Sequence, residues 1–80
     1  MDQIARTPQQ IGAFLRRVRK QKQMSQTALA QKVGLRQATI SAIENGEAGT
    51  LGTLSDILVA LNLELVIRER SVGKAIEDIF

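Results

Sequence analysis

Three consecutive side chains near the middle of the chain have the chemistry needed to recognise nucleic-acid bases. Arg36 can donate two hydrogen bonds to guanine, the Gln37 amide can bond both polar atoms of adenine, and the Ala38 methyl group can contact the methyl group of thymine. Arg36 also stands near an expected helix start, where Ser, Thr, Asp or Asn caps better and where the helix dipole disfavours a cation. This departure from a local rule favours a functional role for Arg36, although an arginine tolerated in a turn is the alternative.

Four helices are expected to position these residues. They cover about residues 8–22, 26–32, 36–45 and 50–61. Apolar residues at helical spacing should form their buried faces: Ile11, Phe14, Leu15, Val18, Leu29, Ala30, Val33, Ile40, Ile43, Leu54, Ile57, Leu58 and Leu61.

Helix boundaries follow from capping and turn residues. Thr7 before Pro8 predicts the first start, because threonine can cap free amides and proline loses no needed hydrogen bond at the first helical position. Ser25 and Thr50 are expected to cap the second and fourth helices. Gly34 permits the left-handed conformation that ends the second helix and turns the chain into the third.

The second and third expected helices have the features of a helix-turn-helix. Ala30 is small where the helices cross, Gly34 permits the tight turn, and apolar residues fix the pair to the other helices. Such a pair presents its second helix outward. Purely structural helix pairs use alanine and glycine in the same way, so this pattern alone leaves a role without DNA open.

The sequences MSQTALAQKVG (24–34) and ISAIENG (40–46) resemble the lambdoid phage Cro and repressor family, also called the XRE family, over about residues 10–62. Within it, residues 36–41 and the strand-like residues 63–70 resemble HipB-type antitoxins, whose members repress their own operon and bind a HipA-like kinase toxin. The resemblance implies a mainly α, compact four-helix lambda-repressor-like domain that binds double-stranded DNA.

The resemblance also implies roles for individual residues. Arg36, Gln37 and Ala38 would approach base edges, with Thr27 nearby, while Arg19 and Glu44 would form an ion pair that braces the first helix against the third. The backbone amide of Gln26 is expected to meet a phosphate at the positive end of its helix. Further candidates for phosphate contact are Ser25, which should act mainly as a cap, and Thr39, Ser41, Arg16, Arg17 and Lys20.

Residues 63–70 alternate between apolar and polar side chains, which predicts a β-strand. Leu63, Leu65 and Ile67 would share one face. Because a lone strand is not stable, we expect it to pair with the same strand of a second copy in a homodimer. A continued helix or an extended tail are the alternatives. The expected organisation is therefore a helix-turn-helix domain with its dimerising strand at residues 1–70, and a C-terminal tail at 71–80 that orders on a partner or frays.

Charge and composition restrict the function. Residues 1–36 hold eight basic side chains against one acidic, whereas residues 37–80 hold three against seven, so one face is suited to a polyanion. The chain has no histidine or cysteine, which argues against an enzyme, a metal site or a cofactor. Two phenylalanines are its only aromatic residues, too few to stack unpaired bases. No membrane span or export signal is evident, which indicates a cytoplasmic protein.

These observations favour a homodimeric repressor that binds an inverted-repeat operator. The third helix of each copy would enter one of two successive major grooves. They also favour an antitoxin with a HipA-like kinase toxin as partner. A stand-alone XRE-family regulator, or a protein-interaction module that does not bind DNA, are the alternatives.

Overall fold

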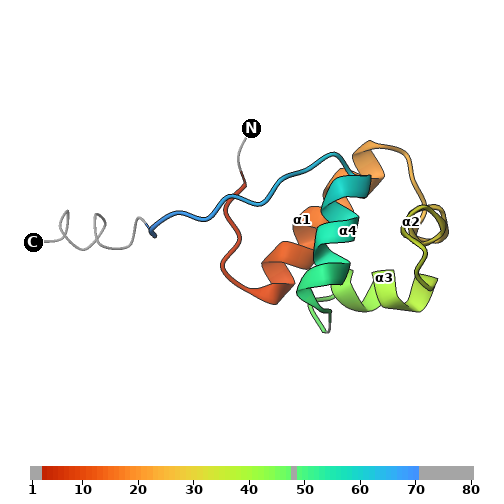
Figure 1. Ribbon diagram of the computed structural model, residues 1–80, viewed down its shortest axis with the longest axis horizontal. Coiled ribbons are helices and arrows are strands. Elements are labelled where there is room, and N and C mark those ends of the chain that lie inside the picture. Colours follow the sequence, from red (N-terminus) through yellow and green to blue (C-terminus); the bar gives the residue numbers. More distant parts are fainter. Residues whose placement is uncertain (1–2, 48, 71–80) are drawn as a thin grey trace, which may run out of the picture.

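The computed structural model describes residues 3–47 and 49–70, which form four packed helices (Figure 1). These are α1 (Pro8–Gln21), α2 (Gln26–Val33), α3 (Gln37–Glu44) and α4 (Leu51–Ala60). The four helices expected from the sequence are confirmed, with bounds that differ by one residue. α3 contacts both α1 and α2, and α4 packs on α2.

Three of the four helices begin with a side-chain cap. The hydroxyl oxygens of Thr7, Ser25 and Thr50 each accept a hydrogen bond from the backbone amide three residues later, at 3.1, 2.9 and 3.1 Å. α3 differs, because Arg36 occupies its N-cap position without any side-chain cap hydrogen bond. The helix that carries the expected base-reading residues is therefore the one that begins without a side-chain cap.

Each helix is followed by a residue in the left-handed conformation. Gln23, Gly34, Gly46 and Asn62 have φ angles of 59°, 73°, 74° and 57°. After each of them the next amide bonds back to a carbonyl five residues earlier, as from Leu35 to Ala30 at 2.8 Å. This geometry satisfies carbonyls that the helix end leaves free and turns the chain sharply.

The core consists of the apolar positions expected from helical spacing. Leu15, Leu29, Ile40, Ile57 and Leu61 are almost fully buried. Val18, Ala30 and Ile43 complete the buried set, and the remaining stripe residues are half-buried against it: Ile11, Phe14, Val33, Leu54 and Leu58. The expected buried faces are therefore confirmed.

α1 and α3 approach so closely that only glycine fits between them. A Cβ on Gly12 would lie 2.4 Å from the carbonyl oxygens of both Ile43 and Glu44. At the end of α3, a Cβ on Gly46 would lie 2.7 Å from backbone atoms of Gln9. The backbone of α1 thus rests directly on the C-terminal end of α3 and fixes the position of that helix.

Residues 63–70 leave the end of α4 as an extended segment that runs away from the helices (blue in Figure 1). They do not continue α4 as a helix. The expected strand is not confirmed, because nowhere in residues 3–47 and 49–70 does another segment pair with this one. Pairing with a second copy stays a prediction. The expected tail at 71–80 lies outside the described residues.

Candidate DNA-binding surface

The expected base-reading residues lie together at the start of α3. Arg36, Gln37 and Ala38 are all exposed. They follow the turn at Gly34 directly, and Leu35 packs against the core within that turn. A partly buried side chain immediately before three exposed residues fixes the backbone from which their side chains project.

A buried ion pair joins α3 to α1. Arg19 and Glu44 are each only 6% exposed, and Arg19 binds the Glu44 carboxylate through Nε at 2.6 Å and Nη2 at 3.0 Å. The remaining guanidinium nitrogen, Nη1, donates to the carbonyl of Met24 at 2.7 Å. Arg19 therefore holds three elements together: its own helix α1, α3 and the turn that leads into α2.

Glu44 also begins a path of hydrogen bonds that reaches the surface. The Gln26 side-chain nitrogen donates to Glu44 Oε1 at 3.1 Å, and the Gln37 side-chain nitrogen donates to the side-chain oxygen of Gln26. Since an ionised carboxylate only accepts hydrogen bonds, Gln26 must turn its NH₂ group toward Glu44 and its oxygen toward Gln37. The buried carboxylate thus sets the direction of both amides.

This arrangement leaves Gln37 with one free donor and one free acceptor side by side. One amide hydrogen of Gln37 is used on Gln26, whereas its second amide hydrogen and its carbonyl oxygen have no partner among the described residues. A donor beside an acceptor matches N7 and N6 of adenine in the major groove. Gln37 is therefore held in a defined orientation by groups of the protein itself.

The side-chain role of Gln26 was not anticipated from the sequence, which suggested only its backbone amide. A weak signal existed, since Gln37 and Glu44 are seven residues apart and so lie on one face of α3. Nothing local indicated that a side chain from α2 would lie between them. That contact depends on how the two helices cross.

The expected phosphate-contacting residues are accessible to different degrees. Ser25 caps α2 through its oxygen, which leaves the hydroxyl hydrogen free to donate. Thr27 is exposed on α2, and Thr39 and Ser41 are half-buried on α3. Arg16, Arg17 and Lys20 are exposed on α1, and none of them has a side-chain partner in the described part of the chain. Their charges are therefore available to a polyanion.

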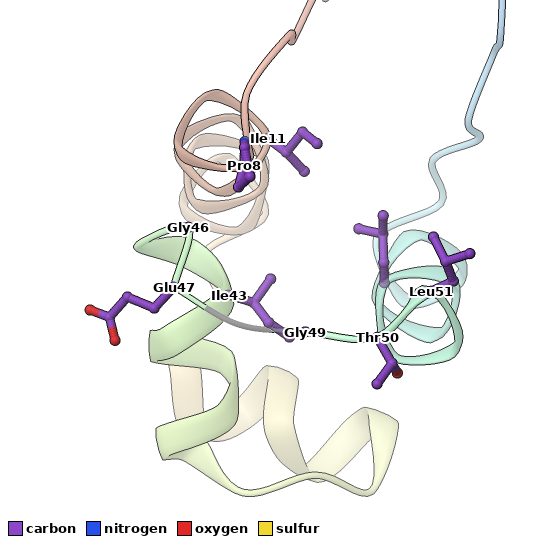
Figure 2. A pocket seen from close by; sticks show the side chains of 9 residues that line it. Pro8, Ile11, Ile43, Gly46, Glu47, Gly49, Thr50 and Leu51 are labelled. Atoms are coloured by element: carbon purple, nitrogen blue, oxygen red, sulfur yellow. The ribbon is translucent and has the colours of Figure 1, made fainter.

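An open hollow of about 440 Å³ lies between α1, the loop after α3 and the start of α4 (Figure 2). Its walls include Ile11, Ile43 and Leu51, while the Glu47 side chain points away from it. The Thr50 hydroxyl is already used in capping α4. The described residues that line the hollow leave no converging polar side chains to orient a small ligand, so the start of α3 is the better candidate for the functional site.

The described residues offer neither a metal site nor a membrane-spanning helix. No three acidic side chains gather closely enough there to hold a metal ion. In the same part of the chain, none of the helices has the length and apolar character required to cross a membrane.

Known proteins share this fold and sequence. A family model described as helix-turn-helix matches residues 15–67, more than half of the chain. An HTH-type transcriptional regulator of Sinorhizobium fredii is 43% identical over 67 residues, which cover 81% of this chain and 34% of that relative, so the chain spans about a third of its length. Antitoxin HipB of Escherichia coli strain K12 is 39% identical over 62 residues, covering 76% of this chain and 70% of HipB.

Solved structures agree with these sequence relatives. A HipB-O4 20-mer complex has a TM-score of 0.78 and 36% identity, and covers 85% of this chain and 97% of that one. A HipA-HipB-O2-O3 complex has a TM-score of 0.77 with the same identity and coverage. The chain therefore belongs to the XRE-type helix-turn-helix family of DNA-binding transcriptional regulators, and within that family it resembles the HipB-type antitoxins.

Proposed function

We propose that this protein is a sequence-specific repressor that binds its own operator as a homodimer and serves as the antitoxin of a type II toxin–antitoxin operon. The proposal that the protein recognises DNA bases is supported mainly by the orientation of the Gln37 side chain, which Gln26 and the buried Glu44 fix. A side chain ordered in advance loses less conformational entropy on binding, so a fixed amide beside an exposed Arg36 suits base recognition.

In the proposed complex, α3 enters the major groove with its first residues against the bases. Arg36, Gln37, Ala38 and Thr27 read base edges. Phosphates are held by the backbone amide of Gln26 at the positive end of α2 and by the remaining candidates, which position the protein without specifying sequence: Ser25, Thr39, Ser41, Arg16, Arg17 and Lys20.

The proposed dimer forms through residues 63–70, which extend beyond the helical domain and pair with the same segment of a second copy. Leu63, Leu65 and Ile67 form the apolar face of that strand. The DNA-binding unit is then residues 1–70, and residues 71–80 are a separate tail. Two-fold symmetry makes the two α3 helices read an inverted repeat, with half-sites about 34–36 Å apart.

The antitoxin role rests on similarity to HipB, which was solved in a complex with HipA. We place the proposed HipA-like kinase on surfaces away from α3, so that DNA and toxin bind together. A HipA-like kinase encoded beside this gene would be co-expressed with the protein. The two are expected to elute together from gel filtration at about 0.5 M salt, where charge contacts are strongly screened. Separate elution would reject the antitoxin role and leave the repressor.

The DNA-binding proposal is tested by fluorescence anisotropy with the DNA immediately upstream of the protein's own gene. Purified protein is titrated at two salt concentrations in the presence of scrambled competitor DNA. Tight binding that survives the competitor and weakens at higher salt is expected. Binding that the competitor abolishes would contradict a sequence-specific repressor.

Two alanine variants separate reading from positioning. Gln37→Ala is expected to reduce discrimination at one base pair by about 1–3 kcal/mol, whereas Arg17→Ala should weaken binding to all sequences and reduce the salt slope by about 1. Competition with a panel of single-base operator variants measures both effects. Each variant is the control for the other, and a uniform loss of affinity in both would show that the division of roles is wrong.

A further inference from the structure

The extended segment after α4 has backbone groups without hydrogen-bond partners among the described residues, so it can pair with another strand. Its side chains Leu65, Val66 and Ile67 are 63%, 67% and 89% exposed. After Leu63, whose amide bonds to Leu58, no backbone group up to residue 70 is hydrogen-bonded within the described residues. The proposed dimer would pair these groups, and its symmetry restricts how they can pair.

Only some registers are compatible with two identical antiparallel strands. Such a pair has its two-fold axis perpendicular to the sheet, so the rotation leaves each residue on the same face. Residues that oppose each other also share a face. Opposing residues must therefore both be odd-numbered or both be even-numbered. The axis must then pass between one residue and the same residue of the partner, and we name the axis after that residue.

The two faces of the segment are distinguishable. Leu63 packs against the core, and both Glu64 and Leu65 line a second hollow on α4. Along an extended strand, the odd-numbered face carries the apolar side chains of Leu63, Leu65 and Ile67. The even-numbered face carries Glu64, Val66 and Arg68.

We infer that the homodimer pairs these strands with its two-fold axis through Val66. This register places Glu64 opposite the partner's Arg68 and, by symmetry, Arg68 opposite the partner's Glu64. On the odd-numbered face it places Leu65 opposite the partner's Ile67, again twice. The register thus matches opposite charges on the even-numbered face and apolar side chains on the odd-numbered face, and both kinds of pair stabilise a sheet.

The neighbouring registers match less well. With the axis through Leu65, Glu64 opposes the partner's Val66 and the ion pairs are lost. With the axis through Ile67, Glu64 opposes the partner's Arg70, but Leu65 opposes the partner's Glu69 and Val66 opposes the partner's Arg68. Of the three, only the axis through Val66 pairs Glu64 with an opposite charge and Leu65 with an apolar side chain. Its one kind of mismatch is Leu63 opposite the partner's Glu69.

Because the chain has no cysteine, single introduced cysteines can report the register. Opposing Cα atoms in an antiparallel pair lie about 4.5 or 5.5 Å apart, within the span of a disulfide of about 4.4–6.8 Å, whereas diagonal neighbours lie about 7–8 Å apart. In a glutathione buffer, Val66→Cys is expected to form a disulfide with its own copy. A mixture of Glu64→Cys and Arg68→Cys should form the mixed disulfide.

Leu65→Cys and Ile67→Cys are the controls, since each would lie diagonal to its own copy. Stronger self-linking by either control than by Val66→Cys would overturn the register and leave the dimer standing. The inference rests on the proposed homodimer, so sedimentation of the unmodified protein is measured first. A monomer at all concentrations would reject the dimer itself, which is a different result from a misplaced axis.

Charge reversal gives a second readout. Glu64→Arg should raise the dimer dissociation constant roughly tenfold, because it replaces two opposing ion pairs by two like-charge pairs. Adding Arg68→Glu should restore dimerisation. Glu69→Arg makes the same change in net charge but faces the partner's Leu63, so it is the matched control. Equal weakening by Glu64→Arg and Glu69→Arg would contradict the register.

Discussion

Replacing Glu44 by alanine is expected to lower the free energy of unfolding by about 3–5 kcal/mol, because the change leaves the buried Arg19 guanidinium without its carboxylate. Arg19 would retain only its bond to the Met24 carbonyl. For a domain of this size, the loss is a large part of the total stability. Urea denaturation followed by circular dichroism at about 222 nm, where the loss of helix is seen, measures the free energy of unfolding.

The neighbouring Glu47→Ala is the control, since Glu47 is exposed and forms no ion pair with a described residue. Its unfolding free energy should change by less than about 0.5 kcal/mol. Replacing both partners, as in Arg19→Met with Glu44→Leu, should recover much of the stability, because no unpaired charge remains buried. If Glu44→Ala were as stable as Glu47→Ala, the ion pair would not brace the helices.

Gly12→Ala is expected to destabilise the protein by about 3 kcal/mol, the upper end of the usual cost of overpacking. The added methyl group would overlap the backbone carbonyls of Ile43 and Glu44, which cannot move aside as a flexible side chain can. This cost acts against the helix propensity of alanine, which exceeds that of glycine by about 1 kcal/mol. The same urea titration measures the net effect.

Gly52→Ala provides a matched comparison within another helix. A Cβ at position 52 would meet only the Thr50 hydroxyl, at 3.9 Å, and its φ is not in the left-handed region. The same substitution should therefore stabilise the protein by about 0.5–1 kcal/mol. The tight contact between α1 and α3 would be disproved if the two variants shifted stability in the same direction.

The helices of this protein were predictable because their signals are local. Thr7, Ser25 and Thr50 each act on an amide only three residues away, and Gly34 ends α2 by its own backbone freedom. Spacing alone identified the buried faces. Gln23 shows the limit of such signals, since glutamine has no preference for the left-handed conformation that it adopts after α1.

The candidate site was predictable only in part. The residue types at positions 36–38 indicated base reading, and the structure places them together on the surface. The bonds of Gln26 to Glu44 and Gln37 join residues 18 and 11 positions apart, so they depend on the crossing of two helices. The strand expected at 63–70 is a different case, because its expected partner is a second copy and no part of the described chain replaces it.

For the operator binding proposed above, the path from Glu44 to Gln37 also limits which side chains position 37 can take. Gln26 must present its oxygen outward while its NH₂ group faces Glu44, so position 37 is offered a hydrogen-bond acceptor. Gln37→Glu, the natural choice for reading cytosine, would set a carboxylate against that oxygen with no hydrogen between them. A library of variants at position 37 alone will therefore favour side chains that donate a hydrogen bond to Gln26. A wider range of bases can be recognised only when position 26 is varied together with position 37.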